Sequence, residues 1–175
     1  ATKLSGALPA IDGSALTNLP SSGASYAIIA DRKTAGTHGG TFTNGAWRTR
    51  ALNTEVSDVD GIVTIASNQF TLQAGKYIVD WSAIARNGTN SHLSRLYNAT
   101  DATLIVESLN GRADGTDGQG LSLGKGYIDI ASAKAFEIQH ICQSTVASNG
   151  FGLAANAYFT VSYEQYLLIK ITKVA

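Results

Sequence analysis

The side chains of this chain that could carry out chemistry are three histidines, one cysteine and several acidic residues. The histidines are His38, His92 and His140, far apart in the sequence. The sequence has no His-x-x-x-His pair of the kind that binds a metal ion and no P-loop for a nucleotide phosphate. It therefore predicts a protein that is not an enzyme and that uses neither a cofactor nor a metal ion.

The acidic residues and the cysteine favour structural roles. Acidic side chains stand on Asp-Gly turn sequences in "SDVDG" (57–61) and "RADGTDG" (112–118), and neither spacing matches a calcium-binding EF-hand loop. Cys142 alternates with Ile138 and His140 in "FEIQHICQ", which predicts a small buried side chain. His140 is then an interior residue or, in an oligomer, a residue near the symmetry axis.

Aromatic rings and planar polar groups are the side chains that hold a saccharide. The candidate platforms are Trp47, Trp81 and Tyr97, although the positions of both tryptophans in predicted strands favour core or interface roles. The polar candidates stand in loops or at strand ends, where binding residues gather on a rigid β-scaffold. The candidate ligand-binding residues are Asn87, Asn90, His92, Arg112, Asp114, Asp117 and Asn149.

The elements that would position these residues are β-strands. From Tyr26 onward, short runs rich in Val, Ile, Thr, Tyr and Phe alternate with clusters of Gly, Asn, Asp and Ser, and no long window keeps helical periodicity. About ten strands joined by turns predict an all-β jelly-roll sandwich with little or no helix. The expected strands are 25–33, 46–52, 62–66, 69–73, 76–86, 91–98, 103–109, 123–130, 135–143, 155–161 and 166–174.

Two of these strands indicate which faces are buried. In "KYIVDWSAIAR" (76–86) the odd positions are apolar and the even ones mostly polar, so one face packs the core. The last strand is apolar on both faces where Tyr166 and Leu168 alternate with Leu167 and Ile169. Such a strand is either central in a sandwich or at a subunit interface. The long glycine-rich segments 34–45, 110–120 and 144–152 are the expected loops.

The N-terminal stretch "GALPAIDGSALTNLPSSG" (6–23) differs from the rest of the chain. "ALPAI" (7–11) and "ALTNL" (15–19) repeat the pattern Ala-Leu-x-x-Ile/Leu with a period of eight. Two copies cannot bury a core of their own, so the stretch is either the end of a longer fibrous repeat that packs on neighbouring chains or a linker. We expect a short extended, shaft-like segment over 1–24 and a jelly-roll head over 25–175.

The composition narrows the choice of partners. Thirteen basic residues balance thirteen acidic ones in the 175 residues, and no Lys/Arg-rich run is present, so nucleic acid is not an expected partner. Charged residues make up only 15%, which suits oligomer contacts or an extracellular setting. No apolar stretch reaches the ~20 residues that cross a bilayer, so membrane insertion is not expected.

The sequence also resembles a known family. The opening "LPAIDGSALTNLP" resembles the short repeats that precede the C-terminal head of bacteriophage tail-fibre and tail-collar proteins. The body resembles phage receptor-binding tip domains of the trimeric jelly-roll type, which are similar in architecture to the tumour necrosis factor and complement globular-head folds. The stretches that carry this resemblance are "GTFTNGAWRTRALNT", "FTLQAGKYIVDWSAIAR", "HLSRLYNATD", "FEIQHICQST" and "YLLIKITKVA".

The resemblance implies a homotrimer at the extracellular tip of a virion tail fibre, with Tyr166, Leu168 and His140 at the trimer interface. It implies non-catalytic binding of a bacterial surface saccharide or outer-membrane protein during host attachment. Two alternatives stay open. The domain could be a structural cap that trimerises a fibre, or a carbohydrate-binding accessory domain of a polysaccharide-degrading tailspike.

Overall fold

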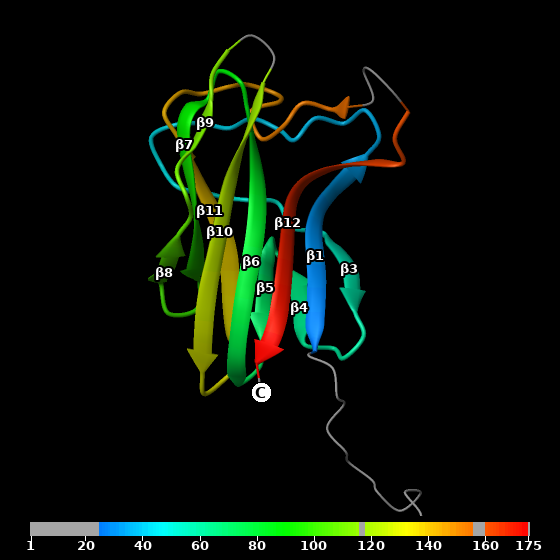
Figure 1. The fold of residues 1–175 in the computed structure, drawn as a ribbon, viewed down its shortest axis with the longest axis vertical. Coiled ribbons are helices and arrows are strands. Elements are labelled where there is room, and N and C mark those ends of the chain that lie inside the picture. The colour runs from blue at the N-terminus through cyan, green and yellow to red at the C-terminus, as the bar shows by residue number, and fades with distance from the viewer. Residues whose placement is uncertain (1–24, 116–117, 156–159, 175) are drawn as a thin grey trace, which may run out of the picture.

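The chain folds into two antiparallel sheets that pack face to face as an all-β sandwich, as the sequence predicts (Figure 1). The computed structural model describes residues 25–115, 118–155 and 160–174. Within these residues it has twelve strands and no helix long and apolar enough to span a membrane. The first sheet has the order β10-β6-β12-β1-β3, and the second has the order β4-β5-β11-β7-β8, with β2 paired to β11 and β9 paired to β7. The strands are β1 (Tyr26–Thr34), β2 (Arg48–Thr49), β3 (Thr54–Asp58), β4 (Val63–Ala66), β5 (Gln69–Leu72), β6 (Gly75–Arg86), β7 (Asn90–Asn98), β8 (Thr103–Glu107), β9 (Gly111–Ala113), β10 (Gln119–Ile130), β11 (Lys134–Cys142) and β12 (Tyr163–Val174).

Alternation along the long strands builds the core between the sheets. In β6 the odd positions from Tyr77 to Ala85 are all buried, whereas the positions between them are partly exposed. A polar contact joins the two sheets inside this core: Trp81 Nε1 donates to Ser94 Oγ of β7 at 2.7 Å. Because both side chains are buried, this hydrogen bond fixes how the two sheets lie on one another.

Most of the predicted strands are confirmed, and the differences have local causes. The expected strand 46–52 forms only β2; the backbone N–H of Arg50 still donates to Ile138 O of β11 at 2.8 Å, but its side chain enters the core. β3 was missed because it is a polar edge strand, and β9 because it lies within the glycine-rich segment 110–120. Residues 156–159 of the expected strand 155–161, and the expected shaft-like segment 1–24, lie outside the described residues.

The apolarity of both faces of the last strand has two causes. β12 is central in the first sheet, between β6 and β1. Its pairing with β1 also shifts, so that Asp31 faces Leu167 and Arg32 faces Gln165, which leaves Tyr166 as a bulged residue. Tyr166 and Leu167 are therefore both buried although they are adjacent. Of the two predicted alternatives, the central strand explains these two residues.

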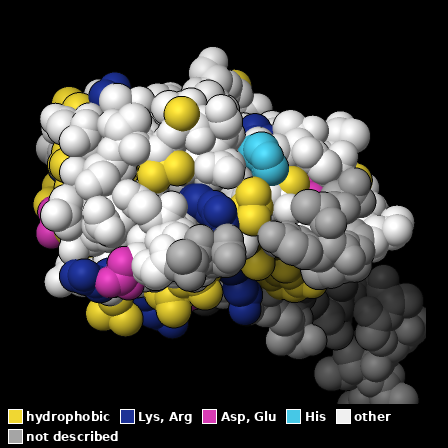
Figure 2. All heavy atoms as spheres, turned by 90° about the horizontal axis from the view of Figure 1, so that it is seen from above, with side chains coloured by type: hydrophobic (Ala, Val, Ile, Leu, Met, Phe, Trp, Pro, Cys, Tyr) yellow, Lys and Arg dark blue, Asp and Glu magenta, His cyan; other side chains and the backbone are white. Residues whose placement is uncertain are grey.

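The head has two unlike ends. Tyr26, which begins β1, pairs with Thr172 near the end of β12, and Figure 1 shows both strand ends together at the bottom. The connections that follow β1, β6, β9 and β11 lie at the opposite end, which we call the distal end. Backbone bonds lock them together: Gly39 N donates to Gly152 O at 2.9 Å, and Arg86 N donates to Gly150 O at 2.9 Å. Figure 2 shows this end from above: uncharged polar side chains and backbone make up most of it, with several Lys and Arg side chains and fewer acidic ones among them.

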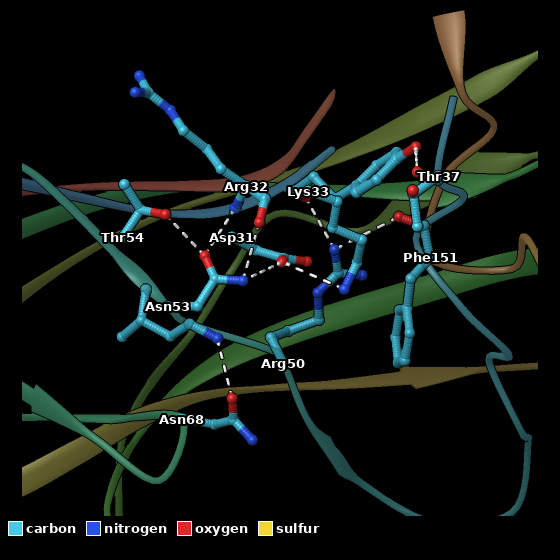
Figure 3. Close-up of polar contacts among 11 residues, drawn as sticks. Asp31, Arg32, Lys33, Thr37, Arg50, Asn53, Thr54, Asn68 and Phe151 are labelled. Carbon is cyan, nitrogen blue, oxygen red and sulfur yellow. Dashed lines mark hydrogen bonds and ion pairs between the residues drawn. The ribbon is translucent and has the colours of Figure 1, made fainter. Parts of the chain in front are cut away.

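A buried arginine ties the distal loops to the sheets (Figure 3). Arg50 is 1% exposed, and its guanidinium donates to the carbonyl oxygens of Ile84 at 2.9 Å, Tyr166 at 2.8 Å and Phe151 at 3.4 Å. The guanidinium carbon also lies 4.2 Å from the centre of the Phe151 ring. Burial lowers the pKa of Arg50 to about 10, an effect that the Asp31 carboxylate opposes. Arg50 therefore stays charged at neutral pH and connects β6, β12 and the loop that carries Phe151.

Candidate functional site

Four of the seven candidate ligand-binding residues meet at the distal end. The backbone N–H of Asn87 donates to the carbonyl of Gly118 at 2.8 Å, which joins the β6–β7 turn to the β9–β10 hairpin. Asn90 Nδ2 donates a hydrogen bond of 3.1 Å to the loop that follows β11. Arg112 Nε donates to Asp114 Oδ2 at 2.6 Å, and this bond lowers the pKa of the Asp114 carboxyl. Residues far apart in the sequence thus form one polar surface.

The other three candidates have different surroundings. Asn149 lies in the distal loop after β11 and is partly exposed. Asp117 lies outside the described residues. His92 is 3% exposed and points inward from β7, because it alternates with outward residues of that strand. Its ring is part of the core rather than of the polar surface.

A groove opens beside these loops on the outer face of the second sheet, and we call it the distal groove. Its volume is about 610 Å³, which is within the range of small-molecule sites. Leu93 of β7 and Ile141 of β11 stand directly opposite each other and point outward, so they form an apolar floor. The groove is lined by Ser91, His92, Leu93, Asn110, Gly111, Arg112, Ile141, Cys142 and Gln143.

Two buried histidines lie behind the groove. His92 Nδ1 and His140 Nε2 are 3.0 Å apart, so one ring donates a hydrogen bond to the other. Burial, together with the positive charge of Arg50, lowers the pKa of His92 to about 4 and that of His140 well below its ordinary value. A Cβ added at Gly111 would lie 2.2 Å from His92 Cε1, and one at Gly120 would lie 2.6 Å from His92 Nε2. The pair is therefore neutral and tightly enclosed, which suits packing rather than proton transfer to a ligand.

The three candidate aromatic platforms separate into one core residue and two surface residues. Trp81 is 4% exposed in the core. Trp47 and Tyr97 are partly exposed on the outer face of the second sheet. Between them lies Arg95, whose guanidinium carbon is 4.0 Å from the centre of the Trp47 ring and 4.9 Å from that of Tyr97.

Only one of the three residues expected at a trimer interface is accessible. Tyr166 is 2% exposed and donates from its hydroxyl to Thr37 O at 2.8 Å, and His140 is 0% exposed. Side chains enclosed by their own chain offer no surface to another. Leu168 is 36% exposed on the outer face of the first sheet, and the structure places the available surface around it.

One stretch carries the letters of a hydrolase motif. Residues 120–124, Gly-Leu-Ser-Leu-Gly, match the pattern Gly-x-Ser-x-Gly, in which the serine stands on a sharp strand-to-helix turn. Here the stretch lies within β10, and Ser122 is 0% exposed, with its hydroxyl bonded to those of Ser94 and Ser108. This serine is not presented as a nucleophile. No group of three or more His, Cys, Asp or Glu that could hold a metal ion is found among the described residues.

Sequence reasoning missed part of this surface. The sequence could have indicated Leu93 and Ile141, because each is an apolar residue on the outward face of its strand, opposite the buried His92 and Cys142. No sequence signal pointed to Arg95. Only the pairing of β7 with β11, and of β11 with β2, brings Arg95 to the Trp47 ring, which directly precedes β2. Asn110 begins the expected loop 110–120 and Gln143 directly precedes the expected loop 144–152, but neither was among the candidates, and the groove identifies both.

Comparison with known proteins bears on the fold. No protein-family model and no curated protein matches the chain. The globular domain of zebrafish complement 1qA protein is 12% identical with a TM-score of 0.51, over 87% of this chain and 98% of that one. Murine APRIL at pH 8.5 is 5% identical with a TM-score of 0.52, over 85% of this chain and 99% of that one. PRD1 vertex protein P5 is 14% identical with a TM-score of 0.49, over 86% of this chain and 97% of that one. The chain has the jelly-roll sandwich fold of the complement and APRIL domains.

Proposed function

We propose that this protein is the receptor-binding tip of a bacteriophage tail fibre or tailspike, which attaches the virion to its host without catalysing a reaction. The observation that carries the proposal is the polarity of the head. The start of β1 and the end of β12 lie together at one end of the head, and the distal groove with its loops lies near the other end. A fibre tip needs this arrangement, because the shaft enters on one side and the receptor is met on the other.

We propose further that the head acts as a homotrimer. Leu121, Leu123 and Leu168 are 53%, 45% and 36% exposed on the outer face of the first sheet. Leu123 of β10 and Leu168 of β12 both pair with Ser82 of β6, so the leucines form a strip on β10 and β12 that is interrupted by the partly exposed Ser82. A strip of this kind is typical of a surface that another copy covers. The hollows beside Leu168 would accept side chains of that copy.

The ligand is proposed to be a saccharide or protein on the bacterial surface. Uncharged polar groups make up most of the distal end, and its groove combines an apolar floor with a rim of polar side chains and Arg112. Both features suit an uncharged, hydrogen-bonding ligand. Three equivalent sites on one tip would raise the avidity well above the affinity of a single site.

Adsorption to cells tests the proposal. We expect the labelled protein to bind some members of a panel of bacterial strains, and the double variant Asn110→Ala/Arg112→Ala at the groove rim to lose most of this binding. Lys76→Ala, in an exposed ion pair at the opposite end, is the matched control and should bind like the natural protein. A trimer that adsorbs to no strain would instead support the structural cap. Release of reducing sugar from capsule or lipopolysaccharide would contradict the non-catalytic assignment.

A further inference from the structure

The outer face of the second sheet carries a second feature below the distal groove, which we call the Arg95 cluster: Trp47, Arg95, Tyr97, Glu137 and Gln139. We propose that the Arg95 cluster is a binding site for a neutral saccharide. The proposal rests on the proposed receptor-binding role, because it names the ligand class of that role and the side chains that contact it.

The guanidinium of Arg95 lies over two aromatic rings. Its carbon lies 4.0 Å from the centre of the Trp47 ring and 4.9 Å from that of Tyr97. Its Nε donates to Gln139 Oε1 at 2.8 Å, across the directly paired positions of β7 and β11. No hydrogen bond among the described residues uses the two terminal nitrogens of Arg95. These donors therefore remain available to a ligand, in an orientation that is already fixed.

A buried carboxylate supports this arrangement from the side, because Glu137 lies on the same face of β11 as Gln139 and pairs with Tyr97. Glu137 is 7% exposed and accepts hydrogen bonds from Thr49 Oγ1 at 3.0 Å, Gln69 Nε2 at 2.9 Å and Gln139 Nε2. The bond to Gln139 fixes the amide so that its oxygen faces Arg95. Side chains from β2, β5, β7 and β11 thus hold one another in a single geometry, which is what a built site requires.

The mixture of groups selects a neutral saccharide. A sugar ring offers apolar C–H groups to an aromatic face and hydroxyls that both donate and accept. Trp47 and Tyr97 supply the aromatic surface, and Arg95 and Gln139 supply polar groups. An anionic ligand is disfavoured, because Glu107 pairs directly with Arg95 across β7 and β8 and is exposed on the same face.

The Arg95 cluster is continuous with the distal groove. Leu93 and Ile141, the floor of the groove, are the next outward residues after Arg95 and Gln139 along β7 and β11. Residues two apart in a strand are separated by about 7 Å. An oligosaccharide that enters the groove can therefore extend over the cluster, which makes the site longer than a single sugar unit.

Intrinsic fluorescence and an oligosaccharide array test the site. The probes are neutral oligosaccharides of hexoses and N-acetylhexosamines and acidic ones that contain uronic acid. The two tryptophans are separable, because Trp81 is buried and bonded to Ser94 whereas Trp47 is partly exposed. We expect binding to neutral members of the array, with a change in Trp47 emission that Trp47→Phe abolishes.

The variants separate a binding role from a structural one. Trp47→Ala and Arg95→Lys should each weaken binding about tenfold, and Trp47→Phe should keep most of it, because it keeps a ring. Tyr163→Ala is the matched control, since Arg32 lies 4.0 Å over the Tyr163 ring and donates from Nε to Gln165, in the same arrangement on the other sheet. A variant is compared only if its circular dichroism spectrum and its mass in solution match those of the natural protein.

Two results would overturn the inference. One is an array on which the folded protein binds no neutral oligosaccharide, and the other is unchanged binding by Trp47→Ala and Arg95→Lys. If the protein still adsorbs to bacterial cells in either case, the receptor-binding role stands and only the ligand class or the location fails. If it adsorbs to no cells, the receptor-binding role itself fails.

Discussion

At the scale of single residues, the core beneath the distal loops places two imidazoles near a fixed positive charge. Arg50 keeps its charge because three carbonyl oxygens accept its hydrogen bonds. His92 and His140 are consequently neutral in the folded state, and the lowered pKa of each couples folding to pH. In the unfolded chain both would bind a proton near pH 6.5.

The pH dependence of stability follows from this difference. Because the folded pKa of His92 is about 4, the free energy of unfolding should be highest above pH 6.5 and should fall as the pH decreases toward 4. The titration of His92 alone should lower the free energy of unfolding by about 2 kcal/mol between pH 7 and pH 5. Burial raises the pKa of Asp31, which acts in the opposite direction above its unfolded pKa and reduces the slope.

Urea denaturation at constant ionic strength and protein concentration measures this dependence. His92→Gln removes one titrating ring and should flatten the curve of unfolding free energy against pH. Equal slopes for the natural protein and His92→Gln would show that the pair does not titrate as proposed.

At the scale of elements, the alternation of apolar and polar residues predicted most strands. The pairing between strands determines which side chains meet, and the alternation alone does not show this. Tyr166 looked like an interface residue because alternation placed it outward, but the bulge opposite β1 turns it inward. His140 was predicted to be interior and also to lie at a trimer interface; it is fully buried within its own chain, and its partner His92 of β7 was predicted to be a ligand-binding residue. The Arg95 cluster depends on the pairing of three strands, which the sequence does not reveal.

A glycine of β10 shows how tightly the Trp81 indole is packed against its neighbouring strand. Gly124 pairs directly with Trp81, and an added Cβ would lie 2.0 Å from Trp81 Cζ2. We expect Gly124→Ala to displace the indole, to break its bond to Ser94 and to destabilise the protein by about 2 kcal/mol. Thermal unfolding and the emission of Trp81 in a Trp47→Phe background report both effects.

Gly118 provides the control for this substitution. A Cβ there would meet only Asp114 O at 3.7 Å, an ordinary contact, so Gly118→Ala should leave the melting temperature nearly unchanged. If Gly124→Ala melts at the same temperature as Gly118→Ala, the contact between Gly124 and Trp81 is not what holds the indole in place.

At the scale of the whole molecule, assembly should depend on the leucine strip of the first sheet. A carboxylate at position 123 would have to be desolvated against apolar neighbours on formation of the proposed trimer, so Leu123→Glu should dissociate it. Mass measurement in solution should then give a single chain of 18.3 kDa. Val59→Glu is the control, because Val59 is 88% exposed in the β3–β4 connection and should leave three chains together. A Leu123→Glu protein that remains trimeric would place the interface elsewhere.

The balance of thirteen basic and thirteen acidic residues has a kinetic consequence for a tip of the proposed kind, because the chain carries no net charge. Long-range attraction cannot guide such a tip to its target, so each encounter depends on diffusion, with association rate constants of about 10⁵–10⁶ M⁻¹s⁻¹. Dissolved ions, which screen charges over about 8 Å at physiological strength, have little to screen here. A virion that carries this tip would capture cells at nearly the same rate in fresh water and in seawater.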